Sequence, residues 1–127
     1  MIITKTPYRI SFFGGGSDYP SWYEKNGGAV LSTTIDKFLY ISCRFSPKYF
    51  KKKYRIVWRK IENVQRVNQI NHKAVRELLK YLKIKPGLEI HYYGDLPARS
   101  GMGSSSCFTV GLMQSLYRIK KINLNKL

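Results

Sequence analysis

The segment that most constrains the fold is a glycine- and serine-rich run, Pro97-Ala98-Arg99-Ser100-Gly101-Met102-Gly103-Ser104-Ser105-Ser106. The alternating residues 88–93 before it predict a strand, and the apolar residues 104–117 after it predict a helix. Two glycines permit a tight turn between them, because a residue without Cβ reaches backbone angles that other residues avoid. The run therefore predicts a strand–turn–helix unit whose helix begins at the serines.

Such a turn is suited to binding an anion. The first amides of a helix lack partners inside it, and the helix dipole adds partial positive charge. The better-known glycine motifs do not fit: Met102-Gly103-Ser104 lacks the lysine of a Walker A loop, and Ser106 stands where a dinucleotide fingerprint needs glycine. A G-x-S-x-G nucleophile turn is also absent. An ordinary glycine turn followed by a serine-capped helix remains the alternative interpretation.

The remaining pattern predicts an α+β fold. Alternation and β-branched or aromatic residues predict strands over residues 2–13, 29–35, 37–45 and 54–58, and a short helical turn over residues 21–25. Asn71 is the predicted N-cap of a helix that Lys85-Pro86-Gly87 ends. One face of that helix is apolar, made of Ala74, Val75, Leu78, Leu79 and Leu82. Strands dominate early and helices late, as in α+β domains.

The composition is that of one small domain with a strong basic excess. Lysine and arginine total 23 against 7 acidic residues in 127, a formal charge of +16, and they are densest between Arg44 and Lys60. We do not expect nucleic acid as a partner, because charge alone indicates nonspecific attraction and no nucleic-acid motif is present. No run approaches the length of a membrane span and no signal peptide is recognised, so we expect a cytoplasmic protein. Cys43 and Cys107 are then expected to be buried free thiols.

Two segments together resemble the GHMP family of small-molecule kinases. Pro97 to Ser105 matches the family's Pro-x-x-x-Gly-Leu-Gly-Ser-Ser motif, with Met102 in place of leucine. Near the N-terminus, Pro7, Arg9, Asp18 and Tyr19 fall at the spacing of the motif found in its sugar kinases. Further blocks resemble the D-glycero-D-manno-heptose 7-phosphate kinase branch: residues 9–12, 14–18, 27–31, 34–37, 72–77 and 108–112.

The resemblance implies a ribosomal protein S5 domain 2-like α+β fold and ATP-dependent phosphorylation of the anomeric hydroxyl of a heptose 7-phosphate. ATP and Mg²⁺ are the implied cofactors, with Ser105 as the magnesium contact. Arg9 is implied in catalysis, where it stabilises the transferred phosphoryl group or orients an aspartate. Asp18 and the glycines before it, Gly14, Gly15 and Gly16, are implied to bind the sugar. The residues implied to bind the nucleotide are Pro97, Gly101, Met102, Gly103, Ser104, Ser105 and Ser106.

Each role has a structural alternative. Arg9 can be a surface strand arginine, Asp18 a turn former and Ser105 a helix-capping residue. His72 at the start of a helix is read as structural. Lys37 and Arg76 are further candidates to face a sugar phosphate.

The resemblance covers about the first third of such a kinase, so residues 1–127 are expected to be part of an N-terminal domain. The catalytic aspartate is expected beyond Leu127, the next helix is expected to start near residues 122–127, and the chain alone is expected to show no turnover. The expected partners are ATP and a small sugar phosphate, and a homo-oligomer of a full-length chain is left open. Two alternatives remain: a kinase of another sugar, such as fucose or galactose, and an inactive fragment that only binds nucleotide.

Overall fold

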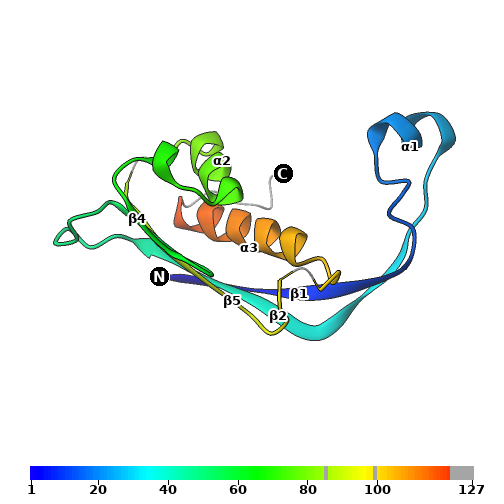
Figure 1. The fold of residues 1–127 in the computed structure, drawn as a ribbon, viewed down its shortest axis with the longest axis horizontal. Coiled ribbons are helices and arrows are strands. Elements are labelled where there is room, and N and C mark those ends of the chain that lie inside the picture. Colours follow the sequence, from blue (N-terminus) through cyan, green and yellow to red (C-terminus); the bar gives the residue numbers. More distant parts are fainter. Residues whose placement is uncertain (85, 99, 121–127) are drawn as a thin grey trace.

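The computed structural model describes residues 1–84, 86–98 and 100–120. A five-stranded sheet in the order β1-β2-β5-β3-β4 carries helices α2 and α3 on one face (Figure 1). Its neighbouring strands are antiparallel except for the parallel pair β3 and β5. The strands are β1 (Ile2–Phe13), β2 (Leu31–Phe45), β3 (Tyr54–Val57), β4 (Ile61–Val64) and β5 (Leu88–Gly94). The helices are α1 (Pro20–Asn26), α2 (Lys73–Tyr81), α3 (Ser104–Ile119) and a short 3-10 helix, η1 (Val67–Gln69). The predicted α+β fold is confirmed.

Helix α3 packs closely on β1 and β2. Its buried residues are Cys107, Phe108, Gly111, Leu112, Ser115 and Leu116. A Cβ at Gly111 would lie 2.7 Å from the Oγ1 atom of Thr6, so only glycine lets the helix approach this strand. The buried Thr4 hydroxyl donates to the Gly111 carbonyl at 3.0 Å and lies 3.0 Å from the Ser115 hydroxyl. These contacts hold the middle of α3 close to β1.

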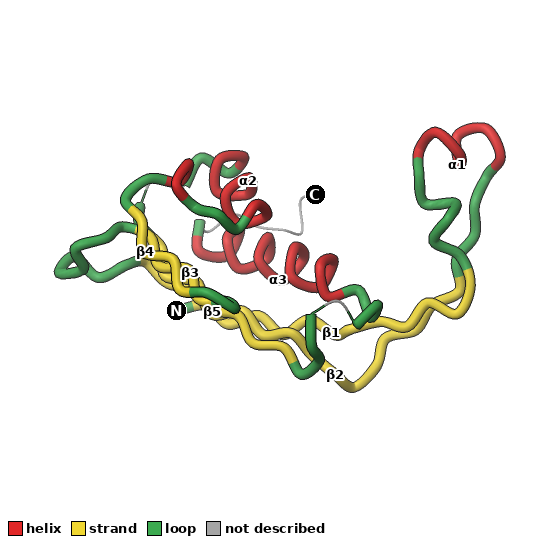
Figure 2. Tube along the Cα trace, in the orientation of Figure 1, coloured by secondary structure: helices red, strands yellow, loops and turns green. Residues whose placement is uncertain are grey.

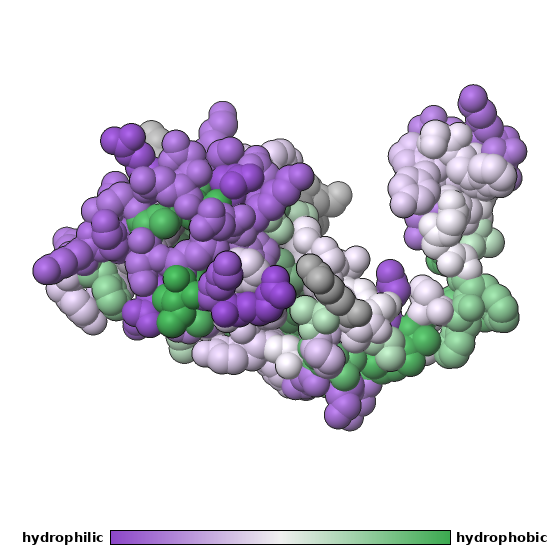
Figure 3. Space-filling view, viewed as in Figure 1, coloured by the Kyte–Doolittle hydropathy of each residue, from purple (hydrophilic) through white to green (hydrophobic). Residues whose placement is uncertain are grey.

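Beyond the sheet, the far ends of β1 and β2 continue as a two-stranded ribbon that carries α1 (Figures 1 and 2). We call residues 12–31 the arm. Its large apolar side chains are exposed, with Phe13 at 73% and Trp22 at 54%, and α1 has no buried residue. Figure 3 shows hydrophobic surface along the ribbon between the sheet and α1. At the base of α1's loop, Gly14 has φ +97°, and a Cβ there would lie 2.6 Å from the Ala29 carbonyl oxygen.

Several predicted boundaries are wrong. Residues 31–45 form one strand rather than two. The register with β1 shifts between the Pro7–Phe38 and Arg9–Thr34 pairs, so residues 35–37 form a bulge. The strand pairs with β1 on both sides of this bulge. Strand β4 was not predicted. The N-cap of α2 is His72 rather than Asn71. The predicted helix start at residues 122–127 and Lys85 of the predicted helix stop lie outside the described residues.

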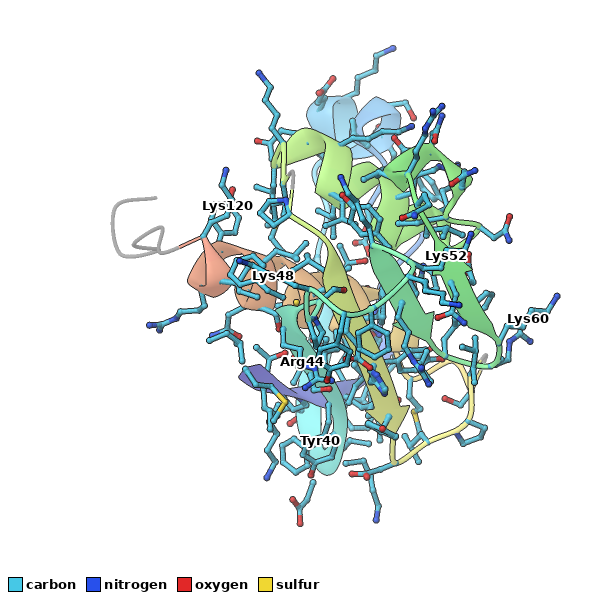
Figure 4. All side chains as sticks on the ribbon, turned by 90° about the vertical axis from the view of Figure 1, so that its left-hand side faces the viewer. Tyr40, Arg44, Lys48, Lys52, Lys60 and Lys120 are labelled. Atoms are coloured by element: carbon cyan, nitrogen blue, oxygen red, sulfur yellow. The ribbon has the colours of Figure 1, made fainter. Side chains whose placement is uncertain are left out.

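Both cysteines are buried free thiols, as predicted. Burial raises the pKa of Cys43 to about 12. The densest basic stretch covers the β2–β3 loop and the turn after β3, where Lys48, Lys52 and Lys60 lie (Figure 4). None of the helices in the described ranges is long and apolar enough to cross a membrane.

Candidate functional site

The glycine–serine loop, residues 97–106, connects β5 to α3 through two glycines with left-handed backbone angles. Gly101 has φ +76° and Gly103 has φ +74°, in the region that favours glycine. Gly103 is the N-cap of α3, and no side chain caps the helix, so the serine-capped interpretation is wrong. The first hydrogen bond of the helix runs from the Cys107 amide to the Gly103 carbonyl at 3.0 Å.

Ser104, Ser105 and Ser106 form the first turn of α3. Their amides and hydroxyls make no hydrogen bond with any residue that the structure describes. Unpaired amides at a helix start, together with the dipole, attract a negatively charged group. The loop therefore has the geometry of an anion-binding helix terminus.

Arg9 on β1 lies against this helix start, although it is about ninety residues away in sequence. The Arg9 amide donates to the Met102 carbonyl at 3.3 Å. A Cβ at Gly103 would lie 3.3 Å from the Cγ atom of Arg9 and 3.4 Å from its Cζ atom. Within the described residues no carboxylate pairs with Arg9. The structure thus brings an unpaired guanidinium to the glycine–serine loop.

On one side of the helix start lies a cavity of about 230 Å³, which we call the aromatic cavity. Four of its rings form a chain. Trp58 and His72 meet edge to face at 4.9 Å, His72 and Phe108 lie 4.6 Å apart, and Phe108 and Tyr92 lie 5.2 Å apart. Ser104 and Ser105 complete the lining on the side of the loop. An apolar, aromatic wall with a few polar groups at one end is typical of a small-molecule site.

Beside the aromatic cavity lies a second hollow of about 520 Å³ that also contacts Asn71, Lys73 and Glu77. The two share Trp58, His72, Ala74 and Ser105 in their linings, so they are neighbours. The Cζ atom of Arg59 lies 5.4 Å from the centre of the Trp58 ring and lines the aromatic cavity. The site therefore combines a flat aromatic end with cationic side chains.

The surroundings of His72 favour the neutral form of its ring. Burial lowers the pKa of His72, and the nearby Glu62 charge opposes this shift only in part. Its Nδ1 atom is buried without a hydrogen-bond partner among the described residues. A neutral ring packs against the other rings without the cost of a buried charge.

On the other side of the helix start lies a pocket of about 330 Å³, which we call the hydroxyl pocket. Arg9 and Ser106 line it on the side of the loop. The rest of the lining includes three consecutive hydroxyl residues of β2, Ser32, Thr33 and Thr34. Ser104 and Ser105 thus face one cavity and Ser106 the other.

Asp18 lies elsewhere, on the arm. It is exposed, its amide donates to the Gly15 carbonyl at 3.2 Å, and it lines a hollow of about 540 Å³ with Ser17, Tyr23 and residues 28–30. The structure does not bring Asp18 and Arg9 into one pocket. A Cβ at Gly15 or Gly16 would meet open space.

Arg76 is engaged elsewhere, since its side chain pairs with Glu77 at 2.9 Å and donates to the Ile70 carbonyl at 3.0 Å. Lys37 lines none of the cavities described above.

The sequence did not single out the two linings. Trp58 and Tyr92 are predicted only as strand residues. Phe108 and Thr34 belong to blocks that carry the family resemblance, but the sequence assigns neither of them a role in a site. Only the packing of α3 against the sheet brings these residues to the glycine–serine loop.

Comparison with known proteins supports the resemblance found in the sequence. Residues 68–127 match the family model of the GHMP kinases N terminal domain. The chain is 30% identical over 132 residues to a D-glycero-alpha-D-manno-heptose 7-phosphate kinase of Campylobacter jejuni, a match that covers 90% of this chain and 36% of that protein. The chain thus spans little more than a third of this relative.

Solved structures share the fold. A D-glycero-D-manno-heptose 1-phosphate kinase from Bacteriodes thetaiotaomicron superposes with a TM-score of 0.79 at 21% identity, over 96% of this chain and 43% of that one. A Streptococcus pneumoniae phosphomevalonate kinase, solved with phosphomevalonate and AMPPNP, gives a TM-score of 0.70 at 18% identity, over 98% of this chain and 38% of that one. The described residues therefore share the fold of part of these kinases.

Proposed function

We propose that this chain, whose resemblance to the GHMP kinases is confirmed by sequence and by fold, is the nucleotide-binding part of an ATP-dependent sugar-phosphate kinase. The observation that carries the proposal is the start of α3. Its unpaired amides and three serines stand between two cavities, with Arg9 beside them. Phosphoryl transfer needs a site for the donor, a site for the acceptor and positive charge between them.

In this proposal the nucleobase enters the aromatic cavity and the phosphates lie over the glycine–serine loop. The rings of Trp58 and Phe108 supply flat apolar surface, and a base gains from stacking on such rings. Gly101 and Gly103 keep the backbone free of Cβ atoms where the phosphates approach, and Pro97 and Met102 shape the loop. The amides and hydroxyls of Ser104–Ser106 then donate to phosphate oxygens.

Magnesium fits this loop through the phosphates of the nucleotide. Mg²⁺ keeps several waters and takes few protein ligands besides substrate phosphates, so one hydroxyl, that of Ser105, suffices on this side. No cluster of three or more His, Cys, Asp or Glu side chains suited to a metal occurs in the described part of the chain. When bound, the ion neutralises charge on the phosphates.

The acceptor is proposed to occupy the hydroxyl pocket, with its reacting oxygen near Arg9. That oxygen attacks the γ-phosphorus, the bond from the γ-phosphorus to the bridging oxygen breaks, and ADP leaves. The guanidinium of Arg9 lowers the energy of the charge that spreads over the transferred phosphoryl oxygens. The acceptor's proton passes to a carboxylate that the resemblance assigns to residues beyond Leu127.

The heptose 7-phosphate named in the relative's description is the proposed acceptor, through its anomeric hydroxyl. Gly14–Gly16 and Asp18 on the arm are proposed to contact sugar hydroxyls once the acceptor lies between arm and loop. We further propose that residues 1–127 are part of a longer cytoplasmic kinase.

Two titrations test the proposal on the chain as it stands. Fluorescent ATP analogue should bind in the presence of Mg²⁺, and both ATP and inorganic tripolyphosphate should displace it. Heptose 7-phosphate should bind more tightly than galactose or fucose, as measured by calorimetry. A chain from which tripolyphosphate displaces no nucleotide contradicts the assignment of the loop.

A further inference from the structure

Glu62 on β4 is a buried acid that joins three parts of the molecule. It is 7% exposed, and in the described residues no lysine or arginine forms an ion pair with it. Its carboxylate instead accepts three N–H groups. The indole Nε1 of Trp58 donates to Oε1 at 2.9 Å, the Asn71 amide to Oε2 at 2.6 Å, and the His72 amide to Oε1 at 3.2 Å.

These three donors belong to the walls of the nucleotide site proposed above. Trp58 follows β3, and Asn71 and His72 directly precede α2. Trp58 and His72 are neighbours in the ring chain and line both the aromatic cavity and the hollow beside it, and Asn71 lines that second hollow. The carboxylate therefore fixes the tilt of one ring and the backbone that carries the next.

The burial of α2 does not depend on this carboxylate alone. The helix packs through Val75 and Leu79, which are fully buried in the core. The two backbone amides that donate to Glu62 come just before the first helical residue, where backbone donors lack partners inside the helix. Charge-assisted bonds to these donors are stronger than neutral ones, so an isosteric amide in place of Glu62 loses part of the constraint.

We propose that Glu62 is a positioning residue for the nucleobase: it holds Trp58 and the Asn71–His72 backbone so that the aromatic cavity keeps the width of a flat ring. This inference rests on the proposed nucleotide site and adds a role for a residue that does not itself line the cavity. It distinguishes the two ends of the ligand, because Glu62 acts on the base end and leaves the loop at residues 97–106 unchanged.

The experiment compares two ligands that share the phosphate end. ATP fills both ends of the site, and inorganic tripolyphosphate fills only the loop. Affinities are measured by displacement of a fluorescent ATP analogue. All variants are made in a Trp22→Phe background, in which Trp58 is the single tryptophan and its indole resonance can be assigned. Glu62→Gln should weaken the affinity for ATP by about tenfold, the equivalent of about 1.4 kcal/mol, and change the affinity for tripolyphosphate less than twofold.

Glu89→Gln is the matched control. Glu89 is equally buried, at 7% exposed, but it bonds Arg44 and His91 and lines neither cavity of the site. We expect this variant to lower the melting temperature and to leave the ratio of ATP to tripolyphosphate affinity unchanged. Trp58→Phe, which keeps a ring but removes the Nε1 donor, should weaken ATP in the same selective way.

A direct structural readout accompanies the binding data. The indole N–H resonance of Trp58 should shift in Glu62→Gln because its acceptor changes, while Glu89→Gln leaves it in place. Equal loss of ATP and tripolyphosphate, or unchanged ATP affinity with a shifted indole resonance, overturns the positioning role. Failure of the parent chain to bind either ligand is a different result, since it removes the nucleotide site itself and the inference with it.

Discussion

Replacing Gly103 with alanine tests how the loop geometry and Arg9 depend on one another. Gly103 has φ +74°, and a left-handed backbone costs other residues about 1–2 kcal/mol. Alanine also restricts the unfolded chain, which returns about 0.4–1 kcal/mol. The net loss of stability from the backbone is therefore about 1 kcal/mol, a fall in Tm of about 4 °C for a chain of this size.

The new Cβ would also lie 3.3 Å from Arg9 Cγ, tighter than ordinary contact. The long Arg9 side chain can move by a few tenths of an ångström, so the contact costs little stability but displaces the guanidinium. Gly101→Ala is the control: its φ of +76° is nearly the same, and a Cβ there meets nothing within 4 Å. Both variants should lose similar stability in urea unfolding. The loss of ATP affinity should be larger in Gly103→Ala than in Gly101→Ala. Equal affinities in the two variants would refute the coupling to Arg9.

The strongest local signals predicted the elements correctly. The alternating residues 2–13 form β1 with the predicted bounds, and the turn before Ser104 gives the predicted start of α3. The break predicted at Asp36 is instead a bulge, because β2 pairs with β1 on both sides of it, at residues 31–34 and 38–43. Strand β4 has only four residues and depends on pairing with β3, a long-range effect that local propensity does not carry.

The sequence predicts only part of the candidate site, and helix geometry explains what it leaves out. Successive residues of a helix point about 100° apart, so a run of serines presents hydroxyls on more than one side. Sequence predicts that these serines open a helix. It does not predict that Ser104 and Ser105 face an aromatic cavity while Ser106 faces Arg9, because those walls also come from β1, β2, β5, the β3–β4 turn and the start of α2. In the sequence, Glu62 is an acidic residue beside a basic stretch, and no pattern marks it. Only the fold brings the three N–H groups that donate to it close to its carboxylate.

Three further measurements bear on the roles assigned above. Ser105→Ala should weaken ATP about tenfold when Mg²⁺ is present, the effect of one lost charge-assisted contact, and much less in EDTA; an equal loss in both would remove the hydroxyl from the metal. Asp18→Asn keeps the size of the side chain and removes its charge, so it should weaken heptose 7-phosphate and leave ATP unchanged, whereas equal effects on both ligands would indicate a structural turn. His72 gives a pH dependence whose sign follows from burial. Its pKa in the folded chain lies below the ordinary value of 6.5, so between the two values the unfolded chain binds more protons than the folded one. The free energy of unfolding therefore suffers no loss from His72 above pH 6.5, and it decreases as the pH falls below this value. His72→Phe keeps an aromatic ring between Trp58 and Phe108 and has no proton to bind, so urea unfolding at a series of pH values should show a smaller acid loss in the variant. Parallel curves for parent and variant would mean that His72 is protonated as readily in the folded chain as in the unfolded one, and that the cavity is wetter than its aromatic lining indicates.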